Sequence, residues 1–131
     1  MKGWGIRLLV LAMLALPATC SQATGNAPKY DKSTEVKVSG VVTEVKDYDC
    51  PISGTLGAHV SIQPEQGPAI EVHVAATKYV KNYEMVFAKG DKVQVLGSKV
   101  QFNGTDAIIA REITRGQDTF TFRDGNGKPL W

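Results

Sequence analysis

The sequence predicts an all-β domain that contains one short helix. Short runs of alternating apolar and polar residues recur along most of the chain, with turn-forming residues between them. Only the stretch that follows Thr77 places apolar residues at helical spacing. No internal repeat or low-complexity block interrupts this pattern, so the chain is expected to form a single domain.

The first predicted strand covers residues 34–46, and its alternation changes phase at Gly40. Val36 and Val38 share one parity, whereas Val41 begins the other. A slip of one residue at a glycine is typical of a β-bulge, which bends a long strand. We therefore expect a bulge or sharp bend at Gly40, which would let the strand pair in both halves of a small barrel.

A loop and then a hairpin are predicted in the middle of the chain. Residues 47–57 are expected to be a loop because proline and glycine recur in them. Two short alternating strands follow at residues 58–63 and 69–75, on either side of a turn rich in proline and glycine at residues 64–68.

The helical pattern starts at Thr77, which we expect to be the N-cap, and stops at Gly90. Val80, Tyr83 and Phe87 recur within it at helical spacing. This aromatic stripe is interpreted as core packing and not as a ligand site.

A second hairpin and a C-terminal extension complete the chain. Asn103-Gly104 is a strong turn between strands at residues 91–102 and 105–114, and the first of these strands changes phase near Gly97. The extension adds a strand, a turn and an apolar plug against the barrel, at residues 118–123, residues 124–127, and Leu130 with Trp131.

The predicted order is β-β-β-α-β-β, with a bent first strand and a helix between the third and fourth strands. This is the order of the OB-fold, a five-stranded Greek-key barrel, here extended by a C-terminal β-hairpin. The passage FAKGDKVQVLGSKV, residues 87–100, resembles the helix-to-fourth-strand segment of many OB domains. Residues 30–131, with the ending DGNGKPLW, resemble a group of small exported bacterial OB-fold proteins. The resemblance implies a fold and is silent on chemistry.

Residues 1–23 have the layout of a secretory signal peptide. Lys2 and Arg7 supply a positive start, and residues 8–16 are an unbroken apolar run of nine. Ser21-Gln22-Ala23 offers a cleavage site, and the apolar run is too short to span a membrane. We therefore expect a periplasmic or secreted protein.

The exported chain divides into a flexible lead-in, residues 24–33, and an OB-fold domain, residues 34–131. The whole chain has 15 basic and 13 acidic residues, and two of the basic ones leave with the leader. A domain with balanced charge has no global field that attracts polyanions.

The two cysteines leave alternatives open. Lipidation of Cys20 would make the protein a lipoprotein, and this is the only membrane attachment that the sequence suggests. Cleavage upstream of Cys20, for example after Ala18, would permit a Cys20–Cys50 disulfide, but most cleavage sites leave Cys50 as a lone thiol in an oxidising compartment. Such a thiol suggests an intermolecular disulfide, a metal ligand or an incidental loop residue, and we favour the incidental residue.

Both histidines of the chain lie in the predicted hairpin of the middle region. A hairpin centred on Gln66 sets His59 opposite His73 and Ser61 opposite Glu71, all on the face that points away from the barrel interior. Opposed side chains are about 4.5–5.5 Å apart at Cβ. OB-folds commonly bind ligands on this face, so these four residues are predicted to contact a ligand. The alternating apolar residues are expected to fill the barrel: Val60, Ile62, Ile70, Val72 and Val74.

Metal binding through His59 and His73 is the first alternative. The pair needs a third ligand, for which Glu71, Asp49 and Cys50 are the candidates, and it suits Zn(II), Cu(II) or Ni(II). The competing interpretation is an ordinary polar face without any cofactor. No catalytic motif is present. Ser61, His59 and Glu71 have the residue types of a nucleophile, a base and an orienting group, but on an open sheet they lack an oxyanion hole, so we expect no enzymatic activity.

Binding of nucleic acid or another polyanion is the second alternative. A loose basic run and three tyrosines would supply it: Lys78, Lys81, Lys89, Lys92, Lys99, Tyr48, Tyr79 and Tyr83. Acidic residues interleave with these lysines, which favours a solvated surface. The sequence therefore predicts a non-enzymatic binding module of the cell envelope, whose partner is a peptide, a glycan or an envelope protein. Its predicted contact residues are His59, Ser61, Glu71, His73, Tyr48, Lys78 and Lys99.

Overall fold

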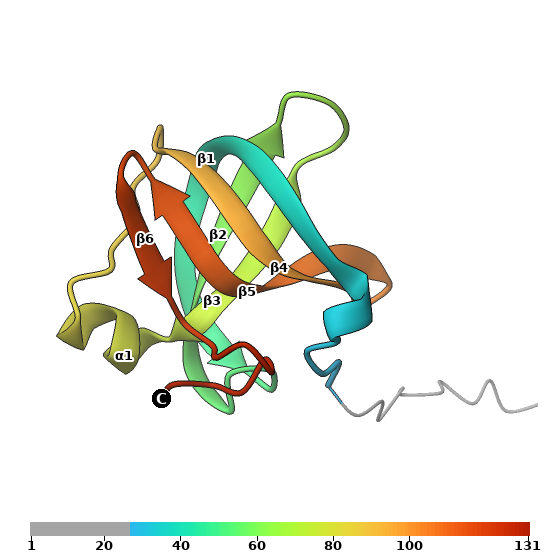
Figure 1. Cartoon of the computed structure of the whole chain (residues 1–131), viewed down its shortest axis with the longest axis vertical. Helices are drawn as coiled ribbons and strands as arrows, with labels where there is room; N and C mark the ends of the chain where they lie inside the picture. Colours follow the sequence, from blue (N-terminus) through green and yellow to red (C-terminus); the bar gives the residue numbers. More distant parts are fainter. Residues whose placement is uncertain (1–26) are drawn as a thin grey trace, which may run out of the picture.

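The structure is a computed structural model that describes residues 27–131 (Figure 1). The predicted signal peptide, its cleavage site and the lipidation of Cys20 lie outside the described residues. Within residues 27–131, no helix is long and apolar enough to cross a membrane.

Six strands form one sheet that closes into a barrel. The elements are η1 (Lys32–Thr34), β1 (Glu35–Cys50), β2 (Thr55–Pro64), β3 (Ile70–Ala76), α1 (Thr77–Asn82), β4 (Lys92–Phe102), β5 (Thr105–Arg115) and β6 (Asp118–Thr121). The strand order is β3-β2-β1-β4-β5-β6, and a parallel pairing of β3 with β5 closes the ring. The predicted all-β barrel with one short helix and a C-terminal hairpin extension is confirmed.

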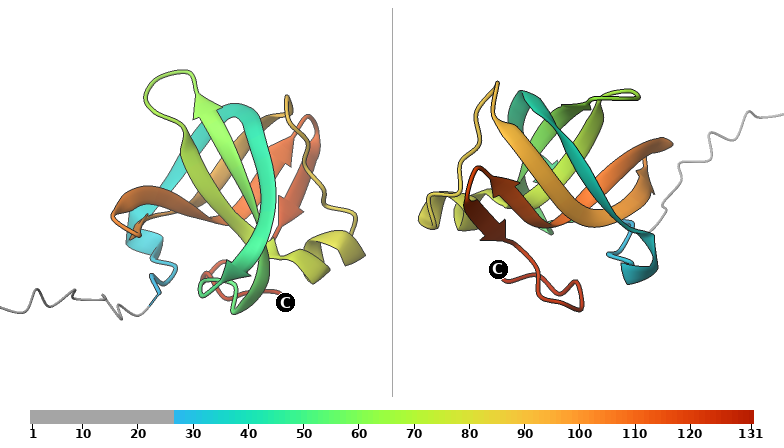
Figure 2. Two further views of the ribbon diagram at one scale, coloured as in Figure 1. Left: turned by 180° about the vertical axis from the view of Figure 1, so that it is seen from behind. Right: turned by 45° about the horizontal axis from the view of Figure 1, so that its top comes forward.

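β1 is shared between the two halves of the barrel (Figure 2). Residues 35–41 pair with β4, and residues 40–50 pair with β2. Gly40 stands at the changeover, where a Cβ would come within 2.6 Å of the Gln63 backbone oxygen. The register shift lies further on, between Val42 and Glu44. Gly40 therefore permits the close approach of β2, and the predicted position of the bulge is wrong.

Two of the predicted strand boundaries are also wrong. β1 continues to Cys50 and β2 starts at Thr55, so only a four-residue turn remains of the loop predicted over residues 47–57. Cross-strand pairing between β1 and β2 overrides the local composition here. The turn between β4 and β5 is as predicted, with positive φ angles at Asn103 and Gly104 that are typical of a two-residue turn.

The helix α1 is shorter than predicted. Thr77 is its first residue, and Ala76 stands at the N-cap position. The Thr77 hydroxyl donates to an Asp47 carboxylate oxygen at 3.1 Å and does not cap the helix. The helix ends at Asn82, and Tyr83 is consequently 65% exposed instead of packing in the core. Val80 and Phe87 are buried as expected.

Part of the predicted flexible lead-in packs on the barrel. The Asp31 backbone N–H donates to Ser98 Oγ at 3.0 Å, and the Tyr30 hydroxyl donates to Glu35 at 2.7 Å. Tyr30 also lines a pocket together with residues of the C-terminal tail, so this part of the lead-in is not a free linker.

The core lies inside the ring of strands. Val60, Ile62, Val72 and Val74 are buried there as predicted, and Ile70 is half-buried at its edge. The phase slip predicted near Gly97 is confirmed as a register shift between Leu96 and Gly97. Beyond β6, the C-terminal tail (residues 122–131) folds back toward the β1–β2 turn (Figure 1).

Candidate functional site

The predicted histidine pair forms. His59 lies opposite His73, and Ser61 lies opposite Glu71, in the antiparallel register of β2 and β3. The two imidazole centroids are 4.7 Å apart in an edge-to-face arrangement. The register follows from the apolar alternation, because a one-residue slip would turn the core residues outward.

The two histidines are buried, so the expected solvent-facing pair is wrong. His59 is 1% exposed and His73 is 4% exposed. The Tyr48 ring stacks on His59 with 3.6 Å between the centroids, and Phe102 meets the His73 ring edge-on at 4.8 Å. Trp131, in the C-terminal tail, lines the same small cavity. A ligand in solvent therefore has no direct access to either imidazole.

Cys50 completes a cluster with the histidines. It is the last residue of β1, it is buried, and its Sγ lies 3.4 Å from His73 Nδ1. One ligand atom from each of Cys50, His59 and His73 lies within 4.8 Å of the other two. We call this group the Cys–His cluster. Of the three predicted third ligands, Cys50 is the one that lies beside both histidines, and it stands at the end of a strand and not in the predicted loop.

The other two predicted ligands are held elsewhere. Glu71 accepts a hydrogen bond from the Tyr48 hydroxyl, and Asp49 is exposed on β1. Burial and the adjacent Glu71 carboxylate raise the pKa of Tyr48, so its hydroxyl keeps the proton that it donates. The hydrogen bond to Glu71 thus holds the Tyr48 ring in place over His59.

Both imidazoles carry a nitrogen without a partner. His59 Nδ1 and His73 Nε2 are buried and accept or donate no hydrogen bond within the described chain. Burial lowers the pKa of both rings, and for His73 burial and the neighbouring His59 lower it to about 4. The rings are therefore neutral at pH 7, the form in which imidazole binds a metal.

The space at the cluster fits one ion. The cavity that Cys50, His59 and His73 line has a volume of about 10 Å³, and it is shared with Trp131 and Arg123. This is the space of a single atom or water molecule. One thiolate and two imidazoles form a ligand set that zinc and copper sites use.

The predicted basic run is spread over several elements. The residues lie on α1, on the loop after it and along β4: Lys78, Lys81, Lys89, Lys92 and Lys99. Lys92 and Lys99 are seven residues apart on one strand, which separates them by about 23 Å. Lys99 is also paired with Asp106 at 3.4 Å. None of these lysines lines the cavity at the histidines.

Residues that the sequence interpretation missed complete the surroundings of the cluster. Phe102 comes from the end of β4, and Arg123 and Trp131 come from the C-terminal tail. Trp131 is fixed by its indole N–H, which donates to the Ser53 backbone oxygen at 3.2 Å. These contacts join segments far apart in sequence. The apolar ending predicts that Trp131 packs against the barrel, but no local pattern signals that it does so at the histidines.

The fold and the cluster define an OB-fold domain with a buried cysteine–histidine site. Among solved structures, the barrel is similar to one described as the crystal structure of the S. pombe Stn1-ten1 complex. That likeness has a TM-score of 0.51 at 14% identity and covers 64% of this chain and 59% of that chain. It supports the fold alone.

A sequence model of the MamS/MamX magnetosome protein family matches residues 34–120, and the chain belongs to this family. The match includes all three residues of the Cys–His cluster and ends before the C-terminal tail. No curated protein matches the chain.

Proposed function

We propose that this protein is an exported, non-enzymatic OB-fold domain that binds one soft or borderline metal ion through Cys50, His59 and His73. The observation that carries the proposal is the convergence of three buried donor groups, two of which have a nitrogen without a partner. Buried polar atoms are almost always hydrogen-bonded, and the exceptions call for an explanation such as a bound ion.

The environment supports metal binding over a purely structural cluster. A buried nitrogen without a hydrogen bond destabilises a fold by about 1–3 kcal/mol. The lowered pKa values of His59 and His73 keep both rings neutral, so protons do not compete with a metal near pH 7. The thiolate form of Cys50 would be the third ligand.

The donor set and its surroundings favour copper(I). A thiolate and two imidazoles are unsuited to Mg²⁺ and Ca²⁺, which prefer oxygen ligands. Arg123 lines the same cavity and contributes a positive charge. Cu(I) bound to one thiolate is neutral overall, whereas Zn(II) would leave an additional positive charge beside the guanidinium. A neutral Cu(I)–thiolate pair costs less free energy to bury than a Zn(II)–thiolate pair with a net positive charge.

Export and the place of action are parts of the proposal. The signal-peptide layout of residues 1–23 supports export, and membership of a magnetosome protein family supports a role connected with the magnetosome. A peptide, glycan or envelope-protein partner would find only Ser61 and Glu71 accessible among the four predicted contacts, because His59 and His73 are buried. The dispersed lysines give polyanion binding no comparable support.

The test is a metal-affinity measurement on the reduced protein. We expect one Cu(I) per chain, bound in competition with a chromogenic chelator, and weaker binding of Zn(II) by calorimetry. Cys50→Ser, His59→Ala and His73→Ala should each lower the Cu(I) affinity by about 100-fold or more. Ser61→Ala is the matched control, because Ser61 lies on the same face of β2 outside the cluster. Equal affinities in the wild type and the three ligand variants would refute the metal site.

A further inference from the structure

A second buried polar group, Arg123, lies beside the C-terminal tail. It is 6% exposed, and within residues 27–131 its one side-chain hydrogen bond runs from Nη1 to the Gly127 backbone oxygen at 2.9 Å. Its Nε has no partner within the described chain. The guanidinium carbon lies 5.0 Å from the Trp131 ring centroid and 5.8 Å from that of Tyr30.

The charge of Arg123 has no counter-charge. No carboxylate of residues 27–131 forms an ion pair with it; the ion pairs there belong to other lysines and arginines. The two aromatic faces attract a cation, yet they replace only part of its hydration. Burial lowers the pKa of Arg123, but a guanidinium stays protonated in proteins. A buried cation of this kind is expected to have an anionic partner.

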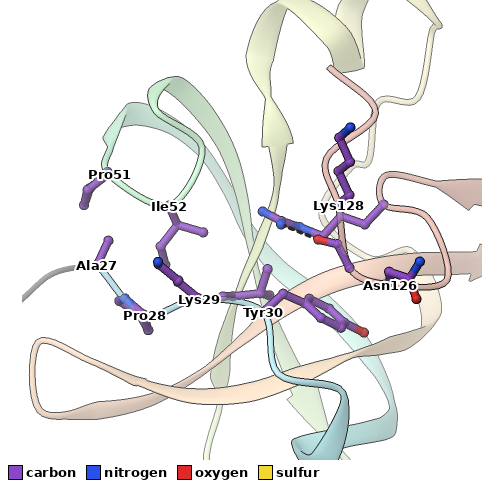
Figure 3. A pocket seen from close by; sticks show the side chains of 11 residues that line it. Ala27, Pro28, Lys29, Tyr30, Pro51, Ile52, Asn126 and Lys128 are labelled. Carbon is purple, nitrogen blue, oxygen red and sulfur yellow. Dashed lines mark hydrogen bonds between the residues drawn. The ribbon is translucent and has the colours of Figure 1, made fainter.

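Arg123 lines a pocket of about 580 Å³ where the lead-in, the β1–β2 turn, β5 and the C-terminal tail meet (Figure 3). Ala27, Pro28 and Lys29 lie on the same side as the β1–β2 turn residues, and Asn126 and Lys128 lie across from them. The charged residues of the pocket are Lys29, Arg123 and Lys128, and its wall contains no aspartate or glutamate. We call it the Arg123 pocket.

The neighbouring acid is already used by the backbone. Asp124 Oδ1 accepts the N–H groups of Asn126 and Lys128, both at 2.9 Å, and these bonds lower the pKa of Asp124. Asp124 therefore shapes the turn and is not one of the residues that line the pocket. Neither Lys29 nor Lys128 forms an ion pair within the part of the chain that the structure describes.

We propose that the Arg123 pocket binds a small organic polycarboxylate. The planar guanidinium of Arg123 would receive one carboxylate, and the amines of Lys29 and Lys128 would receive the others. Apolar side chains supply a surface for the carbon skeleton: Ala27, Pro28, Pro51, Ile52 and Ile109. The pocket volume lies in the range typical of small-molecule sites and exceeds the size of an inorganic ion.

Calorimetry and NMR titration with tricarballylate test the proposal. This tricarboxylate chelates metals weakly, so it separates anion binding from removal of a metal. We expect saturable binding at low salt that weakens as salt is added. Lys29→Gln and Lys128→Gln should each weaken binding about tenfold, and Arg123→Gln should abolish it. Lys37→Gln is the matched control, because it removes an exposed positive charge outside the pocket.

Two results would overturn the proposal. Absence of binding up to about 10 mM, a range in which specific anion sites saturate, overturns the site. Equal affinity for inorganic phosphate overturns the polycarboxylate class. Because Lys29 and Lys128 are exposed, their variants remain informative if Arg123→Gln does not fold. Cys50→Ser is expected to leave tricarballylate binding by the metal-free protein unchanged, because Cys50 does not line the Arg123 pocket.

Discussion

The Cys–His cluster and Arg123 are buried polar groups that line one small cavity, and they respond to burial in opposite ways. The histidines lose their charge, since burial lowers the pKa of His59 and His73. Arg123 stays protonated, and its charge persists inside the protein. The comparison teaches that similar burial gives a neutral, metal-ready site in one case and an anion-seeking site in the other. Stability at the histidines should therefore depend on pH, whereas anion binding at Arg123 should depend on salt.

The largest expected effect is the pH dependence of the metal-free fold. In the unfolded chain His73 takes up a proton near pH 6.5, whereas in the folded protein it does so near pH 4. Stability from the neutral ring is therefore fully present above pH 6.5 and is lost as the pH falls toward 4. At 1.36 kcal/mol per pKa unit, the loss is about 3 kcal/mol.

Chemical denaturation at pH 7 and pH 4.5 checks this loss. His73→Gln should flatten the pH dependence, because glutamine does not titrate in this range. An equal slope in the wild type and in this variant would show that His73 is not the group that titrates.

Gly127→Ala should disturb the Arg123 pocket and leave the histidines in place. Gly127 has a φ of +80°, and a Cβ there would overlap the Tyr30 ring. We expect a loss of about 2 kcal/mol in unfolding free energy, with weaker tricarballylate binding. Gly125→Ala is the matched control, because it has open space and no positive φ. The idea fails if both variants melt at the same temperature.

Tyr48→Phe sharpens the description of the histidine side. The substitution keeps the ring that stacks on His59 and removes the hydrogen bond to Glu71. We expect a loss of about 1 kcal/mol in stability with Cu(I) affinity changed less than tenfold. A large drop in metal affinity would instead assign the hydroxyl a part in the metal site.

Lys99→Gln gives the smallest effect and calibrates the others. It breaks the exposed ion pair with Asp106, and such pairs contribute about 0.2–1 kcal/mol at a surface. Thermal unfolding at low and high salt measures this contribution. A loss above about 1 kcal/mol would mean that this pair contributes more than an exposed ion pair does.

Much of the fold was predictable because it depends on local periodicity. Alternation fixed the β2–β3 register, and with it the pairing of His59 with His73. The burial of that pair was not predictable, because Phe102 and Trp131 reach it from distant segments. Cys50 was misjudged for a related reason: its surroundings read as a loop, whereas pairing with Thr55 makes it the end of a strand.

The Arg123 pocket was invisible to sequence analysis for a further reason. Lys29, Arg123 and Lys128 are separated along the chain, and each is unremarkable among its neighbours. Only the return of the tail toward the β1–β2 turn brings them to one cavity. Charge counts describe the whole domain and miss a local excess of this kind.

The long strand β1 also governs how fast this domain can fold. Its second half pairs with the adjacent β2, but its first half must wait for β4, as in the pairing of Glu35 with Ser98. The parallel closure of β3 onto β5 likewise joins distant segments, as in the pairing of Glu71 with Ala107. Such a high contact order implies slow folding, in milliseconds to seconds, after the whole barrel sequence is available. A nascent chain therefore exposes an unpaired edge of β1 for that time, and binding by a holding chaperone would prevent edge-to-edge association.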